Sequence, residues 1–118
     1  DILKNGVRVG SVTLVTAVLG GTDQGALRTL TDEIKADHPD TVAVLASVVD
    51  GKVSFAACAG KDAVAAGAHA GKLVGAVAAV TGGKGGGRPD SAMAGGHDES
   101  LVAKALESAK ETLGKMLK

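Results

Sequence analysis

Aromatic residues are nearly missing from this sequence, in which Phe55 stands without any Trp or Tyr. Proteins that hold single-stranded nucleic acid usually stack its bases on aromatic side chains, so the composition nearly excludes that binding mode. The formal net charge is zero, because 13 Lys and Arg balance 13 Asp and Glu. Any contact with RNA or phosphate must therefore come from a local cluster of cations, since the chain as a whole is not basic.

Cysteine and long hydrophobic runs are also scarce. Cys58 is the single cysteine, and its Val- and Ala-rich surroundings predict a buried thiol in a reducing compartment. The Ala-rich segment 63–80 is interrupted by His69, Lys72 and glycines, so we predict no membrane-spanning segment. The three histidines lack the spacing of a zinc site, and no nucleophile has a partnered base. We therefore expect neither a metal site nor a catalytic residue.

A chain of 118 residues is long enough for one domain with a modest core. It begins at Asp1 without a Met or a signal peptide, and we expect it to be a fragment of a longer protein.

Runs of Val and Thr predict strands, and apolar residues at helical spacing predict helices. The predicted elements are a long strand over 7–19 bent at Gly10, a helix over 23–37 capped by Thr22 or Asp23, strands over 41–49 and 53–59 joined by a turn at Asp50-Gly51, a helix from 62 that is interrupted near Gly67 and resumes over 69–80, and a helix over 98–116.

This order predicts an α/β fold in which residues 1–118 form a single-domain sandwich, with a mixed β-sheet flanked by about three helices. Between the last two helices lies the most unusual segment, because seven of the eighteen glycines fall between positions 82 and 96. Glycine costs backbone entropy, so such a cluster must use a property of the bare backbone: positive φ, close approach, or N–H groups that meet an anion. Lys84 and Arg88 add positive charge and favour an anion or RNA site.

Two nucleotide-binding patterns do not fit this glycine run. A P-loop needs Ser or Thr after the Gly-Lys pair, whereas Gly85 follows Lys84. A dinucleotide fingerprint needs a strand before the glycines, whereas a helix is predicted there. What remains is a Gly-rich turn between two helices, and its predicted nucleic-acid contacts are Lys84, Gly85, Gly86, Gly87 and Arg88. The alternative is structural: a tight loop that packs closely against the sheet, a helix or a second subunit.

At this run the chain resembles a known family. Residues 82–90 (GGKGGGRPD), followed by Gly95-Gly96, are similar to the signature of the DHHA1 domain in the C-terminal region of alanyl-tRNA synthetases. Segments 50–53, 61–62 and 70–74 are also similar to that family, so the resemblance covers essentially the whole chain.

Two positions mark how the chain relates to this family and its neighbours. Met93 stands where the family commonly has glutamine. The same domain type occurs in DHH phosphoesterases with a Gly-Gly-Gly-His loop, and Arg88 in place of that histidine favours the synthetase branch.

The resemblance implies a noncatalytic C-terminal module of an enzyme that ligates alanine to tRNA(Ala) using ATP. In that family this region helps to bind tRNA, couples aminoacylation with editing and often mediates dimerisation. ATP and zinc belong to other domains of such a parent, so no cofactor is expected in this chain. The implied partners are tRNA(Ala), the other domains of the parent and a second copy of the chain, in the cytoplasm and away from membranes. The alternatives are a nucleotide-binding accessory domain of a DHH-type phosphoesterase and a purely structural dimerisation module.

Overall fold

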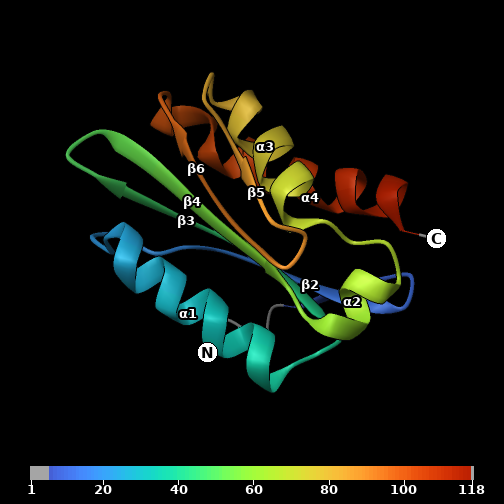
Figure 1. Ribbon diagram of the computed structural model, residues 1–118. Helices are drawn as coiled ribbons and strands as arrows, with labels where there is room; N and C mark the ends of the chain where they lie inside the picture. The colour runs from blue at the N-terminus through green and yellow to red at the C-terminus, as the bar shows by residue number, and fades with distance from the viewer. Residues whose placement is uncertain (1–5, 118) are drawn as a thin grey trace.

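The computed structural model describes residues 6–117, which are built around a six-stranded sheet (Figure 1). In chain order the elements are β1 (Val7–Val9), β2 (Val12–Val18), α1 (Gln24–Asp37), β3 (Thr41–Val49), β4 (Lys52–Ala59), α2 (Lys61–Ala65), α3 (Ala70–Val80), β5 (Lys84–Gly87), β6 (Ser91–Gly96), the 3-10 turn η2 (Glu99–Leu101) and α4 (Val102–Met116). The strand order is β1-β2-β3-β4-β6-β5, and β2 and β3 are parallel while the other neighbours are antiparallel. The predicted α/β fold with a mixed sheet is thus confirmed.

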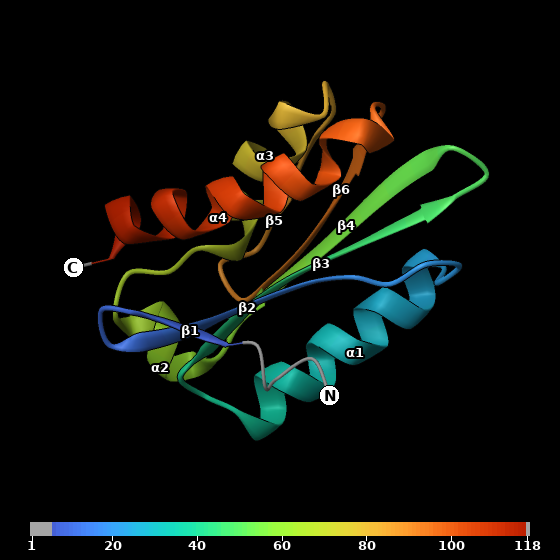
Figure 2. The ribbon, with the colours of Figure 1, turned by 180° about the vertical axis from the view of Figure 1, so that it is seen from behind.

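Helices cover both faces of this sheet. α1 lies on one face, and α3 and α4 lie together on the other (Figures 1 and 2). Successive side chains of a strand point to opposite faces, so Val42 and Val44 of β3 pack into the core under α3 and α4, whereas Leu45 packs under α1. Because both faces are covered, the central strands are continuous apolar runs.

The residues that predict α1 and the β3–β4 turn belong to those segments themselves, and both predictions are confirmed. The Asp23 carboxylate accepts a hydrogen bond of 2.8 Å from the Ala26 N–H, which is the N-cap contact expected of Asp at this position. Leu27 and Ile34 of this helix are buried on its inner face. The turn at Asp50-Gly51 has φ of 52° and 78°, as a tight hairpin connection requires.

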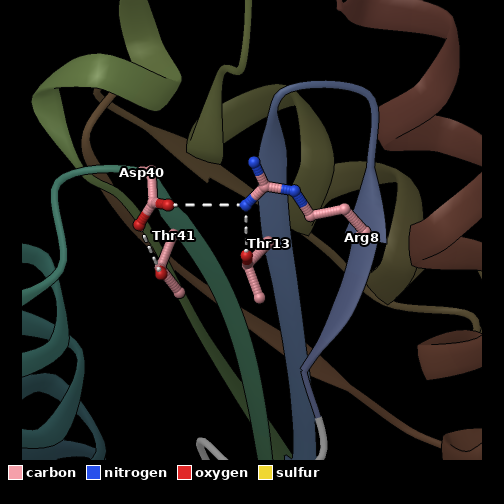
Figure 3. A network of polar contacts seen from close by, with 4 residues as sticks. All are labelled: Arg8, Thr13, Asp40 and Thr41. Atoms are coloured by element: carbon pink, nitrogen blue, oxygen red, sulfur yellow. Dashed lines mark hydrogen bonds and ion pairs between the residues drawn. The ribbon is translucent and has the colours of Figure 1, made fainter.

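The prediction of one long strand over 7–19 is wrong, because the chain reverses at Gly10 and forms the antiparallel pair β1–β2. Gly10 has a φ of 58°, a conformation that glycine adopts without steric cost. Figure 3 shows how this hairpin joins the next strand: Arg8 Nη1 donates to Thr13 Oγ1 at 3.0 Å and pairs with Asp40 Oδ2 at 3.5 Å. The Arg8 and Asp40 side chains are both exposed, so their ion pair contributes little to stability.

The glycine run is also not the turn between two helices that its composition predicts. Lys84–Gly87 and Ser91–Gly96 form the antiparallel hairpin β5–β6, and β6 pairs with β4 in register from Val53↔Gly96 to Cys58↔Ser91. Glycine is disfavoured in strands because it has the most backbone freedom to lose, and local propensity therefore argues against strands here. Hydrogen bonding to β4 and packing under α3 override that propensity.

Candidate functional site

The backbones of α3 and β5 are in direct contact, and glycines on both elements permit it. A methyl group on Gly71 would lie 2.5 Å from the carbonyl oxygen of Gly87, and one on Gly75 would lie 3.1 Å from that of Gly85. The first amides of α3 donate to the turn of the hairpin, from Ala70 to the Pro89 carbonyl at 2.8 Å and from Gly71 to the Arg88 carbonyl at 3.1 Å. These helix N-terminal amides are therefore occupied by protein carbonyls.

Three glycines of the run are explained by close packing within the β5–β6 hairpin. A methyl group on Gly85 would overlap the Ala94 side chain, and one on Gly87 would lie 2.9 Å from the Ala92 methyl carbon. A methyl group on Gly83 would overlap the Gly95 carbonyl. Gly86 differs, because the nearest atom that its methyl group would meet beyond its chain neighbours is the Gly71 carbonyl oxygen, at 3.9 Å. Packing thus requires glycine at three of these positions but not at Gly86.

A polar groove of about 310 Å³ lies between α1 and the β5–β6 hairpin. Arg28, Asp32 and Lys35 of α1 form one wall. They are four and three residues apart, so they share one face of the helix. The other wall belongs to the hairpin, and Lys35 Nζ pairs with Asp90 Oδ2 of that wall at 3.4 Å. The groove thus brings together side chains that are 55 residues apart in the sequence.

Three of the five predicted contact residues line this groove, namely Gly86, Gly87 and Arg88. Lys84 and Gly85 are not among its lining residues. Lys84 stands at the start of β5 and Arg88 just beyond its end, a separation of about 13 Å at the rise of an extended strand. All five residues are exposed, but the structure does not gather the two cations at one point.

The groove carries more positive than negative charge in a chain that is neutral overall. An adjoining groove of about 310 Å³ shares Lys35 and Asp90 and adds Lys61. Together the two grooves present four cations, Arg28, Lys35, Lys61 and Arg88, against two carboxylates. The contribution of α1 is not predicted by the sequence. The spacing of its charges shows that they share a helix face, but no sequence signal places that face opposite the hairpin.

The other side chains that could react are either unreactive or already hydrogen-bonded within the protein. Burial raises the pKa of the Cys58 thiol to about 11, so the thiol stays protonated at neutral pH and is no nucleophile. Asp98 accepts a hydrogen bond from the Ser100 amide and caps the turn before α4. Within residues 6–117, no group of three His, Cys, Asp or Glu side chains is placed to hold a metal ion. In that same part of the chain, no helix has the length and apolarity needed to cross a membrane.

Comparison with known proteins shows which domain family the chain belongs to. The DHHA1 domain family matches residues 11–115. An alanine–tRNA ligase of Trichodesmium erythraeum is 41% identical over 96% of this chain, and one of Clostridioides difficile is 42% identical over all of it. The chain spans 13% of the length of either relative.

Solved structures agree with this assignment. The C-Ala domain of Aquifex aeolicus alanyl-tRNA synthetase superposes with a TM-score of 0.85 at 28% identity, covering 92% of this chain and 97% of that one. A pGpG-specific phosphodiesterase from Vibrio matches 94% of this chain and 36% of its own, with a TM-score of 0.53 and 12% identity, which is a likeness of fold alone. The resemblance to the DHHA1 domain of alanyl-tRNA synthetase is confirmed. The chain therefore belongs to the DHHA1 domain family, in the branch represented by alanyl-tRNA synthetases.

Proposed function

We propose that this chain is a noncatalytic module of an alanyl-tRNA synthetase that helps the parent enzyme to hold tRNA(Ala). One observation carries the proposal: alanine–tRNA ligases match this chain along 96–100% of its length, while the chain spans only 13% of theirs. Ligation of alanine with ATP, and the zinc that editing uses, then belong to other domains of the parent. The same proposal includes a role in coupling aminoacylation with editing and a location in the cytoplasm.

The charged groups of the hairpin support contact with the phosphates of tRNA. Arg88 and Lys84 are exposed on the β5–β6 hairpin, and the sequence offers no exposed aromatic side chain on which a base could stack. Contacts of cations with phosphates release counterions, so the affinity for tRNA must fall steeply as salt rises. Such contacts position the RNA and carry little information about its base sequence.

Replacing Lys84 and Arg88 together by alanine tests this proposal. We expect the double variant to bind a tRNA(Ala) transcript about tenfold more weakly at low salt, with the slope of log affinity against log salt reduced by about 1–2. Filter binding across a salt series measures both quantities. The control is Lys104→Ala, which removes one exposed cation from α4. Equal affinity of the double variant and the unchanged chain would refute the phosphate contacts and leave the family membership intact.

A second function, self-association, is favoured by the position of β5. This strand is the last in the sheet order, and all four of its residues are exposed. An exposed edge strand presents unpaired backbone groups that can pair with a second copy. We expect sedimentation equilibrium to show a concentration-dependent rise above the chain mass of 11.5 kDa. A constant monomer mass over a wide concentration range would exclude the dimer.

A further inference from the structure

We propose that an apolar groove between the β1–β2 hairpin and α4 receives an amphipathic helix from the part of the parent enzyme that precedes β1. This inference goes beyond the proposed function, and it rests on that function only in taking the chain as one module of a longer enzyme. The groove has a volume of about 350 Å³. It is lined by Val7, Leu14 and Thr16 of the hairpin and by Leu106, Glu107 and Lys110 of α4.

The sheet surface beside α4 is apolar but incompletely covered. Side chains alternate along β2, so Leu14, Thr16 and Val18 point to the face on which α4 packs. Val7 shares that face because it pairs with Leu14 across the hairpin. Leu14 is buried, whereas Val7 is 44% exposed and Val18 is 52% exposed. Within residues 6–117, two of the three exposed large hydrophobic side chains therefore lie on this strip of the sheet, and Val49 is the third.

The shape of this strip suits a helix. Leu14 and Val18 are four residues apart in an extended strand, a distance of about 13 Å. About two and a half turns of an α-helix span the same length and present apolar side chains on one face at a spacing of three or four residues. Leu106 of α4 forms the second wall and is almost fully buried. An incoming helix would thus pack against a sheet on one side and a helix on the other, as amphipathic helices do in hydrophobic grooves.

The charges at this groove favour a protein segment over RNA. Glu107 and Lys110 are its charged lining residues, and both are exposed on α4. One carboxylate and one ammonium group give no net positive charge, so a phosphate backbone gains nothing here. A helix that carries one basic and one acidic side chain beside its apolar face can pair with both groups. Such exposed pairs add little affinity but fix the orientation of the helix.

The path of the chain favours a segment of the same protein as the occupant. Gly6 directly precedes β1, and Val7 lines the groove, so the chain that enters β1 passes its rim. The chain spans 13% of the length of the alanine–tRNA ligases that it matches, so such a parent has long segments outside this domain. A tethered segment has an effective concentration of the order of millimolar, so a small apolar contact is enough to hold it.

Thiol labelling tests the docking, because Cys58 is the single cysteine of this chain and is buried. Val7→Cys places a thiol in the groove, and Val49→Cys places one at a valine of similar exposure that does not line it. In the 118-residue chain we expect a maleimide to label both thiols at similar rates. In the parent enzyme Val7→Cys should be labelled about tenfold more slowly, the factor for burying one valine side chain, while Val49→Cys keeps its rate. Peptide mass spectrometry follows each site separately.

A second reporter on the α4 wall makes the test independent of the first. Glu107→Cys should also be labelled about tenfold more slowly in the parent than in the 118-residue chain, whereas Lys104→Cys, on an exposed part of α4 outside the groove, should not change. Adding Val7→Asp to Glu107→Cys should restore fast labelling in the parent, because a carboxylate in the groove opposes burial of the apolar helix face. Val49→Asp is the matched control and should leave the protection intact.

The outcomes identify what covers the groove. Equal labelling of Val7→Cys in the parent and in the 118-residue chain would overturn the proposal. Protection that appears in the 118-residue chain as its concentration rises would make a second copy the occupant, and protection that requires a tRNA(Ala) transcript would make it RNA; either result overturns the proposal as well. Circular dichroism verifies each fold, and if Val7→Cys is misfolded, Glu107→Cys decides. The tRNA affinity of the Lys84 and Arg88 double variant tests the proposed function separately, so the two can fail independently.

Discussion

Replacement of Gly71 by alanine is expected to lower the free energy of unfolding by about 2–3 kcal/mol, the upper part of the range for overpacking a core. Helix propensity alone predicts the opposite, because alanine is about 1 kcal/mol better than glycine inside a helix. The added methyl group would lie 2.5 Å from the Gly87 carbonyl oxygen and 2.9 Å from the Gly87 nitrogen, so α3 must move away from β5. Urea denaturation followed by circular dichroism at the helix band measures the change.

Gly114→Ala is the matched control for this prediction. Gly114 is an exposed residue of α4, and its methyl group would lie 3.9 Å from Val9 Cγ1, an ordinary contact distance. The same chemical change should therefore stabilise the protein by about 0.5–1 kcal/mol through helix propensity. If both variants proved more stable than the original chain, the close contact of α3 with β5 would be disproved.

Truncation of Phe55 to alanine is expected to cost about 3–5 kcal/mol of stability, the usual cost of removing a large aromatic side chain from a core. Phe55 is fully buried in β4 among the residues that pack under α3 and α4. Domains of this size have a total stability of about 5–15 kcal/mol, so the loss is a large share of it. The measurement again relies on circular dichroism, because the chain has no Trp or Tyr for fluorescence.

Phe55→Leu is the matched control. It keeps most of the apolar volume, so it should lower the free energy of unfolding clearly less than Phe55→Ala does. The order of the two losses distinguishes a packing role from an effect on the unfolded chain. Equal stability of the alanine variant and the original chain would mean that Phe55 is not part of the folded core.

The parts of the fold that the sequence predicts are those whose signals are local. The Asp23 cap, the helical spacing of apolar residues over 23–37, and the Asp50-Gly51 turn each depend on residues close together in the sequence, and the structure confirms all three. The β5–β6 hairpin was missed for the opposite reason. Its strands are held by β4 and α3, and nothing within a glycine-rich segment reveals that a neighbour will supply those contacts.

The residues of the groove also fall into two groups, those that the sequence predicts and those that it does not. Arg88, Gly86 and Gly87 could be singled out from the glycine run itself, and the groove includes them. Arg28 and Lys35 could not, because charged residues on a helix face are solvated by default and become part of a site only through what lies opposite. Lys84 is the opposite case. It lies four residues from Arg88 in the sequence, but an extended strand places the two about 13 Å apart.

By itself the sequence determined the domain family, the α/β class and the main helices, because signature residues, periodicity and capping each depend on residues that are close together in the chain. It also determined that RNA binding, if present, must depend on local cations without aromatic stacking, because composition alone decides which groups exist. Only the tertiary structure decided what the glycines do and which cations share a surface. Both depend on the approach of α1 and α3 to the hairpin, and that approach is set by packing between residues distant in the chain, which local propensity does not encode.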